Sequence, residues 1–317
     1  TDWDDYEAKT GYRWKAEEHR VIQNEHRIWT SFVPVSAFAP ANRQKKYPVV
    51  FALHGACNNI FLVEGWGFVQ EAARREWIVI IPSLELDEFV LDILEQAKKL
   101  YPVDTERVYA AGFSYGGWAS NRLGNQYPEV FAAVAPCGTA MDNGFIEGFD
   151  DDREPLPPFD GVPRALAKNI CMPIINVYGE CDGNRFPIYD FRGKAFGLSH
   201  MERPEDIVEG INCWARVNDA EEIRIEDVMA LKGKNDISQA EREVGLPLPE
   251  DCRKTYVADG VTYHRMDLKS RDGVVRVRLL AEMNIPHWPT PEMVRQIFEF
   301  FAHFKRDGKS GKSIYTD

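Results

Sequence analysis

The sequence predicts an α/β fold in which a mostly parallel central sheet is flanked by helices on both faces. Short, continuously apolar runs alternate with stretches that have apolar residues at helical spacing, and this alternation is typical of a parallel sheet. One such run, at residues 108–111, leads into Gly-Phe-Ser-Tyr-Gly at residues 112–116 and then into a helix-like stretch from Trp118. The order strand, sharp turn with a serine, helix is a nucleophile elbow.

The chain opens with strand-like residues. Residues 19–23 and 28–35 flank a plausible turn at Asn24-Glu25, which predicts an antiparallel pair at the edge of the sheet. The run Tyr47–Leu53 is apolar throughout, as expected of a strand that is covered on both faces, and it stops at His54-Gly55.

Helical and extended patterns then alternate up to the elbow. Residues 68–73 have apolar positions at helical spacing, and residues 77–81 form a second buried strand that Pro82 closes. One apolar face marks a helix over residues 89–100, and the strand at 108–111 follows.

Strands are also predicted after the elbow, at residues 130–135 and 172–178, with an edge strand at 274–280. A final helix spans residues 291–304, where Thr290 is the N-cap and Pro291 the first helical residue.

We expect one domain over residues 1–317, interrupted by two insertions at 139–169 and 185–260. The first is too long for a simple connection and is rich in Gly, Pro and acidic residues. Both insertions are candidates for a lid or cap. Their aromatic side chains are compatible with the roof of a pocket or with a small satellite core.

Composition excludes several classes of partner. The formal net charge of −12 and a pI near 5.2 argue against nucleic acid and anionic membranes. No apolar run approaches the roughly 18 residues of a spanning helix, and the acidic start is unlike a signal peptide. We therefore expect a soluble, cytoplasmic protein. The 6 cysteines lack zinc-site spacing, which favours reduced core thiols and no metal.

Ser114 needs a base and an acid at the same edge of the sheet. A serine hydroxyl becomes nucleophilic when an imidazole takes its proton and a carboxylate orients that imidazole. His287 lies between a predicted strand and a predicted helix, and is the expected base. Asp182 follows the strand at 172–178 and is the expected acid, with Glu180 as the alternative.

Two backbone N–H groups should stabilise a developing oxyanion. Tyr115 is expected to supply one, and either Ala56 or Cys57, in the loop after the strand at 47–53, the other. His54 and Trp288 flank this site, and we expect both near the substrate. His54 closes a strand before the elbow, so a role as loop brace is favoured over that of a second base.

These residues resemble the α/β-hydrolase superfamily, within it the polyhydroxybutyrate-depolymerase-like and feruloyl-esterase-like group. The matching stretches are residues 47–55, the Val-Asp-Thr-Glu-Arg-Val-Tyr lead and elbow at 103–117, and His287-Trp288-Pro289. The resemblance implies an α/β-hydrolase fold and ester hydrolysis through a serine acyl-enzyme, without a cofactor.

Two alternatives stay open. The elbow is also similar to that of serine peptidases of the prolyl-oligopeptidase type, and a non-catalytic binding protein could keep the same fold. The expected partner is a small-molecule ester, and a homo-oligomer is left open.

Overall fold

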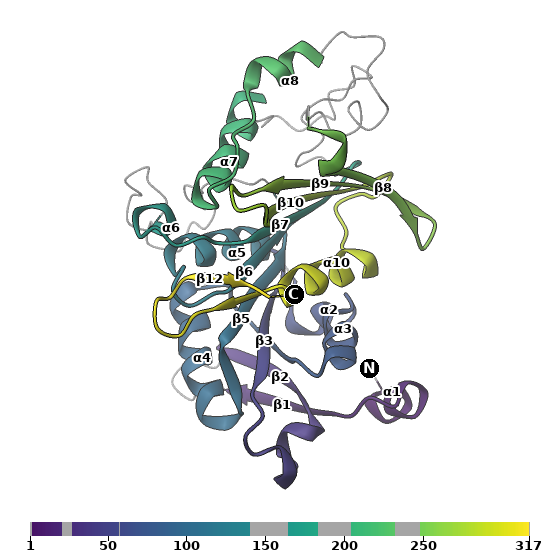
Figure 1. Ribbon diagram of the computed structural model, residues 1–317. Helices are drawn as coiled ribbons and strands as arrows, with labels where there is room; N and C mark the ends of the chain where they lie inside the picture. The colour runs from purple at the N-terminus through teal and green to yellow at the C-terminus, as the bar shows by residue number, and fades with distance from the viewer. Residues whose placement is uncertain are drawn as a thin grey trace.

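The computed structural model describes residues 2–20, 27–56, 58–139, 164–182, 204–231 and 248–316 (Figure 1). Its centre is a 10-stranded sheet with the order β1-β2-β4-β3-β5-β6-β7-β10-β9-β8. The strands are β1 (Trp14–Arg20), β2 (Ile28–Pro34), β3 (Tyr47–Leu53), β4 (Ile78–Pro82), β5 (Val103–Phe113), β6 (Ala133–Cys137), β7 (Ile174–Gly179), β8 (Arg253–Ala258), β9 (Val261–Lys269) and β10 (Val275–Glu282). A separate hairpin pairs β11 (Phe304–Arg306) with β12 (Ser313–Tyr315).

Helices cover both faces of the sheet (Figure 1). They are α1 (Trp3–Thr10), α2 (Ile60–Glu64), α3 (Phe68–Arg75), α4 (Asp87–Leu100), α5 (Tyr115–Gln126), α6 (Arg164–Ala167), α7 (Pro204–Val217), α8 (Ile225–Leu231) and α10 (Pro291–Ala302). Short 3₁₀ turns lie at Val35–Phe38, Pro40–Asn42 and Glu250–Cys252.

The middle of the sheet is parallel and its two ends are antiparallel. Strands β4, β3, β5, β6, β7 and β10 pair in parallel, whereas β1 and β2 add an antiparallel pair on one side. This pair confirms the expected antiparallel edge, but β1 begins at Trp14, earlier than the expected strand at 19–23. Residues 21–26, which include the expected turn, fall outside the described part.

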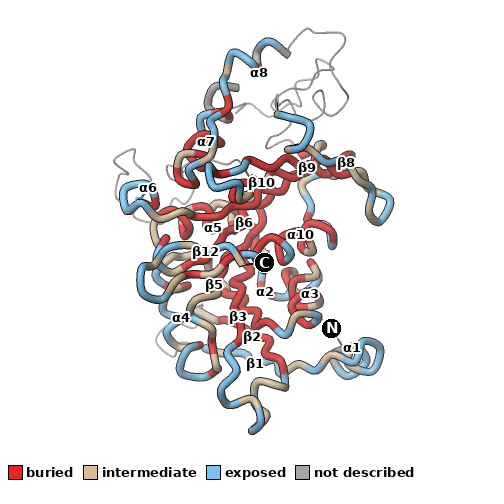
Figure 2. The backbone as a smooth tube through the Cα atoms, viewed as in Figure 1, coloured by how far each residue is buried: buried red, intermediate tan, exposed pale blue. Residues whose placement is uncertain are grey.

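Side chains at alternating positions of the central strands pack into two separate apolar cores, one on each face of the sheet. On β3, Val49, Phe51 and Leu53 pack with α4 and α5, and Val50 and Ala52 pack with α3 and α10. Successive side chains of a strand point to opposite faces, so a continuously apolar run is required where helices cover both. The central strands are accordingly buried along their length (Figure 2).

Two expectations are corrected at the C-terminal half. Strand β10 is not an edge strand, because it lies between β7 and the antiparallel β9. Its neighbour β9 pairs in turn with β8, which lies inside the expected insertion at 185–260. Residues 253–258 therefore belong to the central sheet and not to a cap. Most of the first insertion lies outside the described residues, whereas the described part of the second includes α7, α8 and β8.

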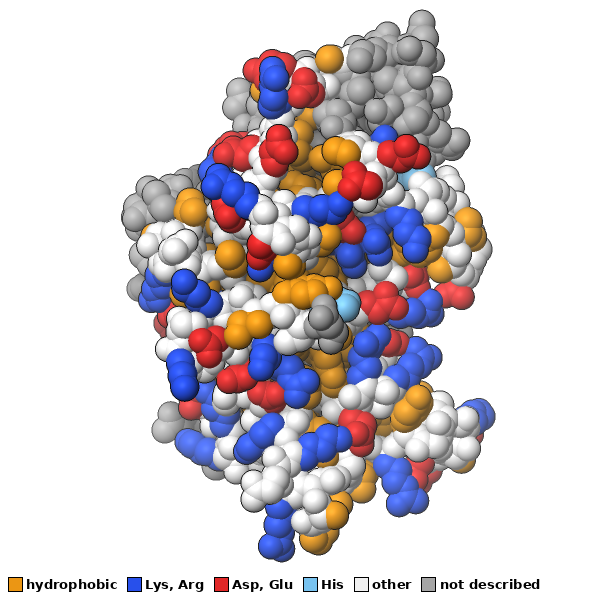
Figure 3. Space-filling model, in the orientation of Figure 1, with side chains coloured by type: hydrophobic (Ala, Val, Ile, Leu, Met, Phe, Trp, Pro, Cys, Tyr) orange, Lys and Arg blue, Asp and Glu red, His pale blue; other side chains and the backbone are white. Residues whose placement is uncertain are grey.

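Charged side chains of both signs are interspersed on the face seen in Figure 3. The net charge of −12 is therefore not gathered into one acidic patch on this face. No helix among the described residues is long and apolar enough to cross a bilayer.

Candidate active site

Ser114 stands at a strained turn between β5 and α5. Its φ of 58° and ψ of −117° are unusual for a residue with a side chain. The turn is held at its start by a hydrogen bond from the Ser114 N–H to Cys137 O, at 2.8 Å. The strand and helix cross so closely that a Cβ on Gly112 would lie 2.2 Å from Gly116 O. These glycines are what permits the elbow, as the sequence motif predicts.

His287 and Asp182 meet at the same edge of the sheet. His287 lies in the loop after β10, and its Nδ1 is 2.6 Å from Asp182 Oδ2 in the loop after β7. The Asp182 side chain is 2 % exposed, whereas the imidazole is 35 % exposed. With Nδ1 engaged by the carboxylate, Nε2 is the nitrogen that can exchange a proton with a hydroxyl.

The loops that carry Asp182 and His287 are joined through their backbones. The N–H of Glu180 donates to Glu282 O at 2.8 Å, and that of Cys181 donates to Ile285 O at 2.9 Å. A Cβ on Gly179 would lie 2.3 Å from Ile285 O, so this close approach requires glycine at the end of β7.

Glu180, the alternative acid, is engaged elsewhere: its Oε2 accepts a hydrogen bond from Asn284 N–H at 3.0 Å. This contact fixes the base loop but leaves the imidazole to Asp182. The structure therefore distinguishes two carboxylates that the sequence alone left as alternatives.

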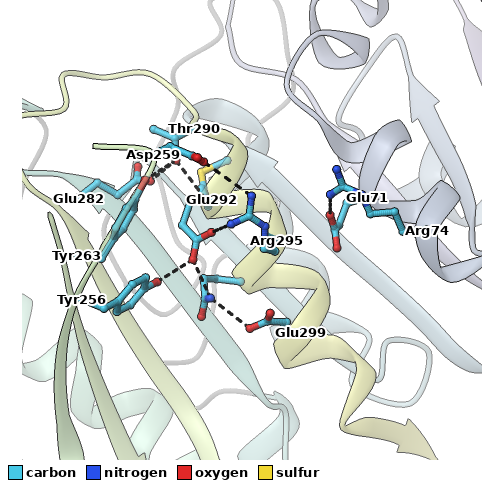
Figure 4. Close-up of polar contacts among 12 residues, drawn as sticks. Glu71, Arg74, Tyr256, Asp259, Tyr263, Glu282, Thr290, Glu292, Arg295 and Glu299 are labelled. Carbon is cyan, nitrogen blue, oxygen red and sulfur yellow. Dashed lines mark hydrogen bonds and ion pairs between the residues drawn. The ribbon is translucent and has the colours of Figure 1, made fainter. Parts of the chain in front are cut away.

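The loop that carries His287, between β10 and α10, is called the base loop here, and it is also fixed at its two ends. Thr290 Oγ1 donates to Glu282 Oε1 and accepts from the N–H of Met293 as the N-cap of α10 (Figure 4). Glu282 is buried, and this burial together with the nearby Glu292 raises its pKa to about 8. At neutral pH the carboxyl group of Glu282, at the start of this loop, is therefore largely protonated.

The His287 ring packs beside the elbow, 4.5 Å between centroids from the ring of Phe113. Among the described residues no hydrogen bond joins Ser114 Oγ to His287. Hydrogen bonds of this kind are often long in unliganded enzymes and tighten when substrate binds.

The loop after β3, which is expected to supply an oxyanion donor and is called the oxyanion loop below, passes beside Ser114. A Cβ on Gly55 would lie 3.3 Å from Ser114 Cβ, so the backbone passes directly by the serine. Ala56 is exposed in this loop, and Cys57 lies outside the described residues. Tyr115 begins α5, where the first N–H groups of a helix have no intrahelical acceptor.

His54 does not face this space. The residue is 7 % exposed, and its ring contacts Gly55 O, Ser83 O and Glu85. This position fits a loop brace, and contact of His54 with a substrate stays a prediction. By contrast, Trp288 is 53 % exposed beside the base.

The residue that the sequence analysis missed is Glu85. It lies in the loop after β4 and is 3 % exposed, with Oε1 2.5 Å from His54 Nδ1. Its position just after a parallel strand was the available signal, because the carboxyl ends of such strands converge on the site. Among the described residues, no group of three or more metal-ligating side chains is assembled.

Comparisons with known proteins agree with this architecture. The model of the prolyl oligopeptidase family matches residues 85–155. The chain is 28 % identical over 138 residues to a bifunctional acetylxylan esterase/xylanase of Neocallimastix patriciarum, and this match covers 39 % of this chain and 20 % of that protein. It is 29 % identical over 119 residues to feruloyl esterase B of Thermothelomyces thermophilus, and this match covers 36 % of this chain and 38 % of that protein. The chain thus spans less than half of these relatives.

Two solved structures are similar over nearly the whole chain. An S-formylglutathione hydrolase from Agrobacterium tumefaciens has a TM-score of 0.53 at 13 % identity, covering 92 % of this chain and 95 % of that one. The acetyl xylan esterase from Aspergillus awamori has a TM-score of 0.52 at 13 % identity, covering 91 % and 99 %. The chain is therefore an α/β-hydrolase-fold protein whose sequence is similar to those of acetylxylan and feruloyl esterases.

Proposed function

We propose that the chain is a serine carboxylesterase with Ser114, His287 and Asp182 as its triad. The observation that carries the proposal is the 2.6 Å contact between His287 and Asp182 at the edge of the sheet where the elbow holds Ser114. The esterase names of the sequence relatives support the same class of reaction.

The reaction follows from these positions. Ser114 Oγ attacks the ester carbonyl carbon while His287 Nε2 takes the hydroxyl proton, and Asp182 stabilises the imidazolium that forms. The tetrahedral intermediate collapses, the bond to the alcohol oxygen breaks, and His287 returns the proton to that oxygen. Water, activated by His287, then hydrolyses the acyl-enzyme and releases the carboxylic acid.

The negative oxygen of the intermediate needs N–H donors at fixed positions. The N–H of Tyr115, at the start of α5, is one donor in this proposal. The loop after β3 supplies the other, from Ala56 or Cys57. The passage of Gly55 beside Ser114 supports this assignment.

The substrate in this proposal is an ester with an aromatic or a short acyl group. Two exposed aromatic side chains flank the catalytic loops in sequence: Trp288 follows the base, and Phe61, which is 66 % exposed, follows the oxyanion loop on α2. Exposed aromatic rings of this kind offer apolar surface to a bound acyl or alcohol group.

Replacing the nucleophile tests the proposal. Ser114→Ala should lower kcat for short-chain aryl esters by about 10⁴ to 10⁶-fold, as expected when a triad nucleophile is lost. Ser310→Ala, in the distant β11–β12 hairpin, should leave kcat unchanged. A fluorophosphonate probe should label the wild type at Ser114. Equal turnover by wild type and Ser114→Ala would exclude the mechanism, and an unlabelled, inactive wild type would favour a non-catalytic binding protein.

A peptidase is the second candidate, because the prolyl oligopeptidase family model covers the elbow at residues 85–155. The two candidates share the nucleophile and differ in the leaving group, an amine or an alcohol. Turnover of a proline-containing peptide amide at a kcat/KM above that for aryl esters would favour the peptidase.

A further inference from the structure

A buried His–Glu pair lies directly behind the oxyanion loop. His54 is the first residue after β3 and starts this loop, and Glu85 belongs to the loop after the neighbouring strand β4. Their side chains are 9 % and 3 % exposed, and Glu85 Oε1 lies 2.5 Å from His54 Nδ1. Two ionisable groups have thus been withdrawn from water together.

The hydrogen-bond partners of His54 define its protonation state. Nδ1 lies 2.9 Å from Gly55 O, and Nε2 lies 3.0 Å from Ser83 O. A carbonyl oxygen can only accept a hydrogen bond, so an imidazolium, which carries a proton on each ring nitrogen, satisfies both contacts. A neutral imidazole has one N–H and would leave one of these contacts unsatisfied.

The charge of Glu85 points to the same state. Among the described residues, its buried Oε1 makes no hydrogen bond, although it lies in ion-pair contact with His54. An isolated buried carboxylate is strongly unfavourable, whereas a carboxylate beside an imidazolium is balanced. The charge pair therefore stabilises both loops only while His54 is protonated.

Close backbone packing at Gly55 and Gly116 connects the His54–Glu85 pair to Ser114. Gly55, whose carbonyl accepts from the His54 ring, lies so close to Ser114 that a Cβ added to it would lie 3.3 Å from Ser114 Cβ. A Cβ on Gly116 would lie 2.4 Å from Leu53 O and 2.6 Å from His54 O, so the backbone of the oxyanion loop is packed on the first turn of α5. A shift of His54 would thus move the second oxyanion donor.

Arg122 ties the Glu85 loop to the same helix. Arg122, on α5, donates to Glu85 O at 2.9 Å and to Asp87 Oδ1 at 2.7 Å. Arg122 and Asp87 are the other charged groups that face the Glu85 loop from α5 and α4. Their charges balance one another, and Glu85 is left as the counter-ion of His54.

We propose that protonated His54 and Glu85 form a buried ion pair that holds the oxyanion loop against Ser114, so that loss of the His54 proton sets the alkaline limit of turnover. His54 and Glu85 are positioning residues, because neither touches the reacting atoms. The inference rests on the proposed esterase function and adds a group that controls it.

The expected pH range follows from the surroundings of His54. Burial lowers the pKa of His54, but the Glu85 carboxylate and the carbonyls of Gly55 and Ser83 outweigh burial, and the net pKa is raised. The pair is therefore complete at pH values below this raised pKa and is lost as the pH rises through it.

The test compares pH profiles of kcat for wild type and Glu85→Gln. The variant keeps the shape of the side chain but removes the charge that favours the imidazolium. Its alkaline limb should move to lower pH, while the acidic limb stays in place. At the optimum, kcat should fall about tenfold with KM changed less than about twofold, a fraction of the loss seen when an oxyanion donor is removed. Glu88→Gln, which removes an exposed charge from the same segment, is the matched control and should leave both limbs unchanged.

The outcomes separate this inference from the proposed function. An inactive, unlabelled wild type contradicts the esterase itself. An active wild type whose alkaline limb is unmoved by Glu85→Gln overturns the ion pair. A measurement without substrate follows the ring directly: in NMR spectra of ¹⁵N-histidine-labelled protein, with the His54 signal assigned by His54→Gln, the ring should keep both protons to higher pH in wild type than in Glu85→Gln. If Glu85→Gln does not fold, a wild-type ring that loses its proton below its ordinary pKa of 6.5 overturns the inference.

Discussion

At the residue scale, the site depends on which of two neighbouring carboxylates faces the imidazole. Asp182 and Glu180 are two positions apart in one loop, yet Asp182 contacts His287 and Glu180 contacts the backbone of Asn284. Asp182 is also the more deeply buried of the two, which strengthens its interaction with an imidazolium.

Paired substitutions in this loop should separate the two roles. Asp182→Asn should lower kcat by about 10⁴-fold, because the amide no longer selects the correct tautomer of the imidazole. Glu180→Gln keeps an acceptor for Asn284 N–H, and kcat should change less than about threefold. Steady-state kinetics on an aryl ester measures both. Losses of equal size would contradict the assignment of Asp182 as the acid.

At the element scale, the elbow depends on how closely β3, β5 and α5 approach one another. Gly112 and Gly116 face each other across the turn, and Gly116 also packs on the last residues of β3. The neighbours at these positions are backbone atoms, which cannot rotate away as a side chain could. The three elements therefore fix the strained backbone of Ser114 together.

A methyl group at Gly116 should break this packing. Gly116→Ala would place a Cβ 2.4 Å from Leu53 O, and we expect the free energy of unfolding to fall by about 2 kcal/mol or more, as for overpacked cores. Gly65→Ala is the control, because its Cβ would meet Leu62 O at 3.3 Å; its effect should stay within about 0.5 kcal/mol. Urea unfolding followed by circular dichroism measures both, and similar values would refute this account of the elbow.

At the scale of the whole molecule, the sheet joins the catalytic loops into one edge. Strands β3, β5, β7 and β10 run in parallel, so the loops that carry Gly55, Ser114, Asp182 and His287 all leave at their carboxyl ends. The antiparallel strands β9 and β8 extend the sheet beyond β10, and β9 places the Tyr263 hydroxyl 3.4 Å from Thr290 Oγ1, just after His287 in the chain.

The free energy of unfolding should depend on pH through one buried group, Glu282. The pKa of Glu282 is raised to about 8 from an ordinary 4.5, because burial disfavours the carboxylate. Between these values the folded chain holds a proton that the unfolded chain has lost, so this group lowers the free energy of unfolding as the pH rises.

Glu282→Gln should remove that dependence, because the amide is neutral throughout and still accepts from Thr290. Urea unfolding at pH 5 and pH 8 should therefore show a larger loss of stability in wild type than in the variant. Equal losses would mean that Glu282 is ionised in the folded chain.

The sequence by itself determined the order of the parallel strands along the chain and the elbow, and it predicted His287 as the base with Asp182 or Glu180 as the acid. It did so because buried strands are continuously apolar, a tight turn needs Gly112 and Gly116, and catalytic loops follow strands. The tertiary structure alone decided that Asp182 and not Glu180 faces the base, that β10 is interior and that Glu85 pairs with His54. These outcomes depend on contacts between separate segments, such as β9 against β10 and the β4 loop against the oxyanion loop. The local sequence pattern does not specify which segments contact one another.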